Sequence, residues 1–231
     1  WTGCLAASLL WNLHEQREKT IEIAHISAQV TFDNDVLYRR WAAQQGGVYV
    51  PVSEHTPPNP YLNVPNRDVT TTSGLSLTLL NPAYMARQVN QLAQQGRGSR
   101  AHLTSLKPLR PDNAPDPFEK AALTSFEEGV KEVSAFDSRN GRQDLRLMRP
   151  FLIEKPCLRC HALQGYKEGD IRGGIGVSVP MEPILALERP QVARTSIAHG
   201  LVWLLGLVGL TLWGRGLEKH VAARERAEQA A

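Results

Sequence analysis

Residues 132–154 read EVSAFDSRNGRQDLRLMRPFLIE and carry the pattern that decides the fold. Two strand-like runs, 132–137 and 144–154, lie on either side of the pair Asn140-Gly141. An Asn-Gly pair between two such runs is a strong hairpin signal, because both residues tolerate the positive φ of a tight turn. The segment therefore predicts two antiparallel strands joined by a turn.

Further strands are predicted on both sides of this hairpin. After it, residues 171–180 form a β-rich run that contains three glycines. Before it, residues 48–52, 75–80 and 101–110 have strand character.

Helices are predicted between these strands. Residues 14–45 carry apolar side chains at helical spacing, and Gly46-Gly47 ends that segment. Asn81-Pro82 begins a second helix that runs to about Gln95, and Asp116-Pro117 caps a third over 118–132. Proline-rich loops are expected over 53–68 and 108–117. The order of elements predicts an α+β domain over 14–195 with no internal repeat.

Composition excludes one class of partner. The chain has 231 residues, 21% of them charged, and its net charge is +3. A nucleic-acid-binding protein would carry a far stronger basic footprint, so no nucleic-acid partner is expected.

Residues 157–161 read Cys-Leu-Arg-Cys-His, which is the C-x-x-C-H attachment signature of c-type haem. Cys157 and Cys160 can add to the two vinyl groups on one edge of a porphyrin, and His161 then lies under the iron as its proximal ligand. The alternatives are a redox dithiol or half of a zinc site. Zinc would need two more ligands, and the remaining cysteine, Cys4, lies in the apolar start of the chain. We therefore expect one covalent haem c.

A transmembrane helix is predicted over residues 196–214. These 19 residues carry no Asp, Glu, Lys or Arg and reach about 28 Å as a helix, close to the hydrocarbon thickness of a bilayer. Basic residues are more frequent after the span than before it, which predicts a cytoplasmic tail over 215–231 and an outer domain. Haem attachment to such motifs takes place outside the cytoplasm, so the expected location is a bacterial inner membrane with the haem domain in the periplasm.

The first 13 residues, 1–13, are apolar but too short to span a bilayer. They are interpreted as the end of a first transmembrane helix or of a signal anchor; the alternative is an amphipathic start to a soluble helix.

The motif does not identify the sixth ligand of the iron. Met85 on the second helix is favoured, because Met is a frequent axial partner of His in c-type cytochromes, although Met commonly also fills core space. His102 and His25 are the alternatives, and an open site is a further one. The remaining candidates are His55, Met148, Met181 and His14.

Several further motifs resemble one family, that of the PAS-like c-type haem sensor domains at the extracytoplasmic N-terminus of bacterial histidine kinases and related receptors. The motifs, which cover about residues 20–185, are 35–41 (DVLYRRW), 46–51 (GGVYVP), 58–62 (PNPYL), 81–88 (NPAYMARQ), 104–106 (TSL) with 113–116 (NAPD), 147–150 (LMRP) and 171–175 (IRGGI).

The resemblance implies a PAS-like antiparallel sheet flanked by helices, a single haem, and redox or gas sensing. Shorter relatives carry a cysteine as distal ligand on the helix before the Thr-Ser-Leu segment, roughly where Met85 lies. Many relatives have a histidine before the Gly-Gly pair, whereas this chain has Gln45.

Two functions follow. The first is a sensor in which the haem redox state or a diatomic gas changes the domain, and the last helix carries the change inward. The second is an electron-transfer haem subunit of a membrane respiratory or photosynthetic complex. An enzyme is not expected, because no distinctive acid–base constellation is evident. A homodimer or a larger membrane complex, and a redox partner, are the other expected partners.

Overall fold

The computed structural model describes residues 1–96, 98–139 and 141–229, without the side chains of Gln94, Arg139, Cys160 and Leu163. The chain forms two compact units. One consists of Ile23–Glu182, and the other of Trp1–Glu22 together with Pro183–Ala231.

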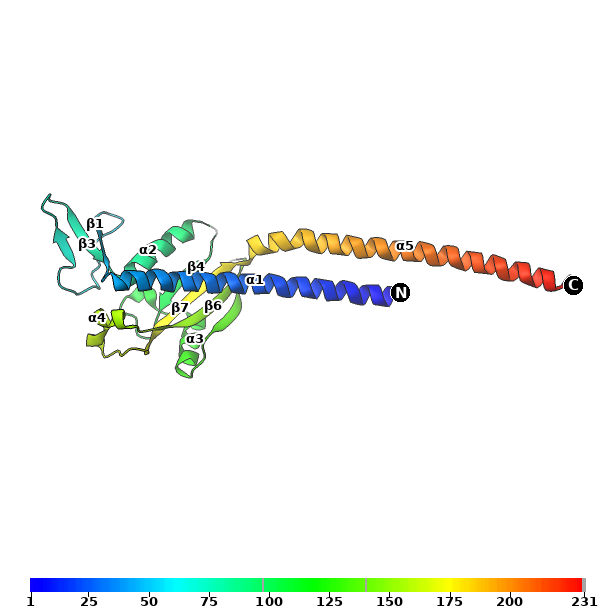
Figure 1. Cartoon of the computed structure of the whole chain (residues 1–231). Coiled ribbons are helices and arrows are strands. Elements are labelled where there is room, and N and C mark those ends of the chain that lie inside the picture. The colour runs from blue at the N-terminus through cyan, green and yellow to red at the C-terminus, as the bar shows by residue number, and fades with distance from the viewer. Residues whose placement is uncertain (97, 140, 230–231) are drawn as a thin grey trace. The chain divides into compact units, whose positions relative to one another are not determined.

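The regular elements follow one another as helices interspersed with antiparallel strands (Figure 1). In chain order they are α1 (Thr2–Gln44), β1 (Val48–Pro51), β2 (Asp68–Thr70), β3 (Ser76–Leu80), α2 (Pro82–Gln95), β4 (Arg100–Thr104), η1 (Pro111–Asn113), α3 (Pro117–Glu127), β5 (Val133–Arg139), β6 (Arg142–Leu152), η2 (Lys155–Cys157), α4 (Leu158–His161), η3 (Ala162–Gln164), β7 (Ile171–Pro180) and α5 (Met181–Gln229).

The predicted hairpin forms one side of the larger sheet, with β5 at its edge. β5 and β6 pair antiparallel from Val133 opposite Met148 to Arg139 opposite Arg142. The turn predicted at Asn140-Gly141 includes Asn140, which lies outside the described residues. β7 pairs with the other edge of β6, and β4 pairs with β7, so the order is β4-β7-β6-β5. The α+β class and the antiparallel sheet flanked by helices are confirmed.

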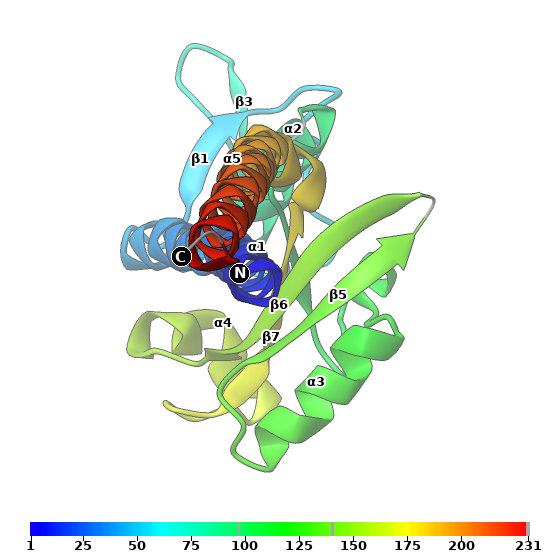
Figure 2. The ribbon, with the colours of Figure 1, turned by 90° about the vertical axis from the view of Figure 1, so that its right-hand side faces the viewer.

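The two faces of this sheet pack against different helices (Figure 2). Odd-numbered residues of β6 face α1: the guanidinium carbon of Arg149 lies 5.5 Å from the ring centre of Phe32, and that of Arg39 lies 6.0 Å from the ring centre of Phe151. The even-numbered Met148 faces α3 and joins a buried cluster with Phe126. The alternation follows from the two-residue period of a strand.

The core on the α1 face is built from side chains that lie opposite each other on β6 and β7. Leu147 lies opposite Val177, and Leu145 opposite Val179, and all four side chains are buried. Burial of side chains of this size contributes about 1.5–3 kcal/mol each. Ala24 of α1 is also fully buried, and small residues of this kind let a helix lie close to its neighbours.

A second sheet, ordered β1-β3-β2, leads into α2. Asn81 caps α2 by accepting a hydrogen bond of 2.9 Å from the backbone N–H of Tyr84, and Pro82 occupies the first turn. The hydroxyl of Tyr84 donates to the carbonyl of Pro57 at 2.8 Å. This contact fixes the proline-rich loop against the helix.

Several boundaries differ from the sequence predictions. The first helix extends back to Thr2 and so includes residues 2–13. β2 lies at the end of the segment predicted as loop, because its residues pair with β3. β4 ends at Thr104 rather than 110. α3 ends at Glu127 rather than 132, because Gly129 takes a φ of +94° and turns the chain into β5.

The smaller unit pairs the start of α1 with α5 in antiparallel fashion. Trp203 Nε1 donates to Thr2 Oγ1 at 3.1 Å, and Gln16 Nε2 donates to Thr195 Oγ1 at 2.8 Å. Among the described residues, α5 is the helix that is long and apolar enough to cross a membrane. Its predicted span, 196–214, and the cytoplasmic tail 215–231 stay predictions.

Candidate functional site

The segment that contains Cys157 and His161 consists of short helical turns. η2, α4 and η3 follow each other directly from Lys155 to Gln164. Gly165 ends the series with a φ of +86°. Because residues four apart lie on the same side of a helical turn, Cys157 and His161 both face one cavity.

His161 is oriented by its own turn. Its Nδ1 atom lies 2.9 Å from Gln164 Oε1, so Nδ1–H can donate to that amide oxygen and leave Nε2 available for a metal. Burial lowers the pKa of His161, and the charge of Arg172 lowers it further, whereas the hydrogen bond to Gln164 raises it. The net direction favours the neutral imidazole, which is the form that binds metals.

The cavity has a volume of about 650 Å³, within the range of about 300–1,000 Å³ that is typical for cofactor sites. Its walls come from the second half of α1, the Gly-Gly turn, the small sheet, α2, the segment after β4, the start of β7 and the α4 region. The lining includes Val36, Leu62, Val64, Leu79, Ala83, Leu103, Leu109, Phe151 and Ile153 as apolar members. The described lining residues thus combine apolar side chains with the thiol of Cys157 and the imidazole of His161.

Arg172, at the start of β7, brings a positive charge into this wall. Its Nη1 atom donates to Ser105 Oγ at 3.1 Å, and its guanidinium carbon lies 5.0 Å from the ring centre of Tyr166. The Nε atom is buried and makes no hydrogen bond within the described part of the chain. An unpaired donor of this kind fits a negatively charged group of a bound cofactor.

Arg87, on α2, is a second cation in the wall. Burial lowers its pKa, and the neighbouring charge of Arg110 adds to that effect. Its guanidinium carbon lies 4.4 Å from the ring centre of Tyr84. By contrast, Arg40 pairs with Glu154 and Arg110 with Asp112. Arg39 pairs with Asp35, and Arg159 also lines the cavity. An anionic group would therefore compensate Arg87 and Arg172 before the paired arginines.

The ligands predicted from sequence are placed as follows. Cys157 and His161 line the cavity, whereas the side chain of Cys160 lies outside the described part of the structure. Met85 is half-buried on α2 and shares a helical face with the exposed Val89 and Leu92. The residues of α2 that line the cavity are instead Pro82, Ala83, Tyr84 and Arg87.

The histidine alternatives hold other partners. His102 Nδ1 lies 2.9 Å from Glu119 Oε1, and its Nε2 lies 3.3 Å from the carbonyl oxygen of Asp112. His25 Nε2 lies 2.8 Å from Glu132 Oε1. Neither is among the described residues that line the cavity. The identity of the distal ligand stays a prediction.

The less favoured candidates are distributed over the molecule. Met148 and Met181 are fully buried, and His55 and His14 are exposed. Gln45, which stands where many relatives have a histidine, does line the cavity.

Arg87 and Arg172 were not predicted as site residues from the sequence. A signal was present, because both lie inside motifs that carried the family resemblance, 81–88 and 171–175. Arginine in such a motif is easily interpreted as surface charge until its burial is known.

The match to one family model agrees with the sequence motifs. The family model described as "Tll0287-like: Tll0287" matches residues 15–180. A crystal structure of the cyanobacterial haem protein Tll0287 aligns with a TM-score of 0.43 and 18% identity, covering 69% of this chain and 95% of that chain. A comparison with curated proteins gives no match.

Proposed function

The chain belongs to the Tll0287-like family, and on this premise we propose that its larger unit holds one covalent haem c and acts as a redox or gas sensor in a membrane protein. The resemblance to c-type haem sensor domains stated from the sequence is confirmed by the family match. The observation that carries the proposal is the joint position of Cys157 and His161 in the wall of one cavity of about 650 Å³.

The residues of the cavity fit such a group. Cys157 and Cys160 would form the thioether bonds, and His161 would bind the iron through Nε2 while Gln164 fixes its ring. Arg87 and Arg172 would hold the two carboxylates of the porphyrin. Haem supplies an iron that changes oxidation state and can bind a diatomic gas. The apolar part of the wall would limit the access of water to that iron and would thereby influence its potential.

The path of the chain favours a sensor over an electron carrier. Arg172 lies at the start of β7, and β7 leads directly into α5 at the fully buried Met181. Arg39, which lines the cavity, lies on α1, and α1 continues into the other unit. Both connections between the two units therefore begin in elements that carry cavity residues.

Membrane attachment is the second part of the proposal. α5 contains the predicted span 196–214, and the bond between Trp203 and Thr2 places residues of 1–13 beside it. A helix pair of this kind fits a two-helix membrane anchor, with the haem unit in the bacterial periplasm and residues 215–231 in the cytoplasm.

Replacement of Arg172 by glutamine should lower the midpoint potential of the bound haem. The guanidinium favours the ferrous state, because the ferric iron carries one more positive charge. We expect the midpoint potential to fall by tens of millivolts. For comparison, a tenfold change in a one-electron equilibrium corresponds to about 59 mV. Spectroelectrochemical titration measures it, and Arg142→Gln, at an exposed position outside the cavity lining, is the matched control. Equal potentials in the three proteins would exclude a role for Arg172 at the haem.

Hydrogen exchange tests the sensor function. The full chain in detergent is compared in its ferric, ferrous and carbon-monoxide-bound ferrous states. A sensor should change amide exchange in β7 and in residues 36–44 of α1 by severalfold, because local opening free energies respond to ligation. Identical exchange in all three states would instead indicate the alternative function, an electron-transfer haem subunit with a rigid site.

A further inference from the structure

One wall of the cavity is a segment without regular strands, residues 105–114, here called the wall segment. Ser105, Pro108, Leu109, Arg110 and Asn113 contribute to the lining. Because it contains only the short η1, this segment depends on side-chain contacts for its position.

Two side-chain contacts stabilise the wall segment: one joins it to β4, and the other lies within it. Thr104 Oγ1 donates to the carbonyl of Asn113 at 2.8 Å, and Arg110 Nε donates to Asp112 Oδ2 at 2.9 Å. The Arg110–Asp112 pair matters for the cavity, since the charge of Arg110 acts on Arg87 there.

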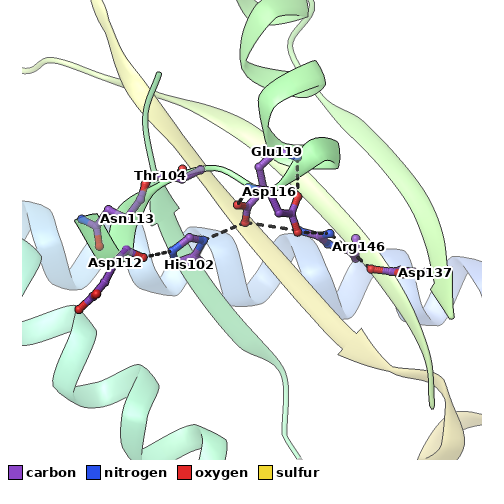
Figure 3. A network of polar contacts seen from close by, with 8 residues as sticks. All are labelled: His102, Thr104, Asp112, Asn113, Asp116, Glu119, Asp137 and Arg146. Carbon is purple, nitrogen blue, oxygen red and sulfur yellow. Dashed lines mark hydrogen bonds and ion pairs between the residues drawn. The ribbon is translucent and has the colours of Figure 1, made fainter. Parts of the chain in front are cut away.

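The third contact comes from His102 and reaches beyond the segment (Figure 3). One ring nitrogen faces the carboxylate of Glu119 on α3, and the other faces the backbone carbonyl of Asp112 in η1. Both partners can only accept. A neutral imidazole has one N–H, whereas the protonated ring has two and donates to both. Only protonated His102 therefore donates to both the wall segment and α3, into which the wall segment leads through Pro115 and the capping residue Asp116.

The groups on α3 and η1 that face His102 are mainly acidic. Glu119 is buried and belongs to a capping box with Asp116 at the start of α3. On η1, the carboxylate of Asp112 is paired with Arg110. The hydrogen bond to Glu119 raises the pKa of His102, and burial opposes that effect.

The sheet contributes groups that balance this charge. Arg146 on β6 lies 2.7 Å from Asp116, 3.4 Å from Glu119 and 3.4 Å from Asp137 on β5. Arg100, on the same strand as His102, pairs with Asp144 of β6 at 2.7 Å. Gly176 and Ser178, the residues that β7 contributes here, are uncharged. These residues and Arg142 of β6 border a second, polar cavity of about 680 Å³, and the His102 side chain in its lining is 42% exposed to solvent.

We propose that His102 is a proton-dependent latch that holds the wall segment against α3, so that protonation of His102 and the state of the haem in the neighbouring cavity are coupled. Because coupling is reciprocal, a change at the haem that moves the wall segment must also change the proton affinity of His102. The coupling to haem rests on the proposed function; the latch itself does not.

The direction of the pH effect follows from the raised pKa of His102. The protonated form gains its two partners only in the folded protein, so its stabilising contribution is complete below the unfolded value of about 6.5. This contribution is lost as the pH rises through the higher folded value. The wall segment should therefore loosen as the pH rises past the raised pKa of His102.

Hydrogen exchange of the holoprotein across about pH 6–9 measures the latch, after correction for the intrinsic pH dependence of exchange. We expect amides of residues 105–114 to exchange about threefold to tenfold faster above the transition, on the scale of one lost hydrogen bond. His102→Gln, which cannot become charged, should remove this transition. His25→Gln, which disrupts a comparable histidine–glutamate pair at Glu132, should keep it.

A transition that persists in His102→Gln, or is missing from the unmodified protein, would overturn the latch. Ring-proton NMR of His102 in the unmodified protein provides a second measurement that needs no variant. A measured pKa of His102 at or below the ordinary histidine pKa would also contradict the latch. The midpoint potential of the haem tests the coupling, because its pH dependence across the His102 titration should flatten in His102→Gln. An unchanged pH dependence of the midpoint potential would overturn the coupling. A protein without haem would contradict the proposed function, and its hydrogen exchange would still test the latch.

Discussion

Serine at both Cys157 and Cys160 should abolish covalent haem attachment, so that the denatured protein shows no haem stain on a gel. Serine hydroxyls do not add to the vinyl groups, and the two thiols are the covalent anchors that the motif provides. The expected loss is complete rather than partial, because both anchors are removed together. The comparison requires coexpression with a c-type maturation system in the periplasm.

Cys4→Ser is the matched control for this experiment, since Cys4 lies in the smaller unit and is exposed. It should keep the full haem stain of the unmodified protein. Haem that remains attached to the double serine variant would show that the motif is not the attachment site.

Replacement of Gly173 by alanine should strongly destabilise the larger unit. A β-carbon there would lie 2.2 Å from the carbonyl oxygen of Thr104 and 3.1 Å from the β-carbon of Ser105. The backbone of Gly173 lies outside the left-handed region, so the loss of stability comes from steric overlap alone. Overpacking of this kind costs about 1–3 kcal/mol, which corresponds to roughly 2–12 °C in the melting temperature of a domain of this size.

Thermal denaturation of the full chain in detergent, followed by circular dichroism, measures this loss. Gly98→Ala is the control, because no atom lies within 4 Å of its added carbon, and its stability should change by less than about 0.5 kcal/mol. Since Thr104 and Ser105 also line the cavity, Gly173→Ala should change the haem spectrum as well. Equal melting temperatures for Gly173→Ala and the control would mean that β4 and β7 do not approach as described.

The sheet was predictable because its signals are local. Strand runs on either side of Asn140-Gly141 predicted the hairpin, and the glycine-rich run 171–180 became β7. β2 was missed because the prolines before it dominate that segment, while its pairing with β3 depends on the tertiary fold. The end of α3 was misplaced by five residues, since apolar spacing continues past Gly129.

The site was predictable only in part. Cys157 and His161 follow from one motif, and the family match agrees with the resemblance on which the haem prediction also rested. The cavity arginines were not identified, because burial and the unpaired Nε of Arg172 are properties of the assembled fold. Met85 was favoured from its place along the chain, whereas which face of α2 lines the cavity depends on packing. Sequence position alone does not determine that face.

The most direct test of the account is the pyridine haemochrome of the unmodified, denatured protein. Both cysteines belong to one attachment motif, so the haem should stay with the polypeptide through acid–acetone extraction and give the spectrum of a c-type haemochrome. Haem that passes freely into the acetone, or a protein that matures without haem, would contradict the assignment of this cavity to a covalent haem c.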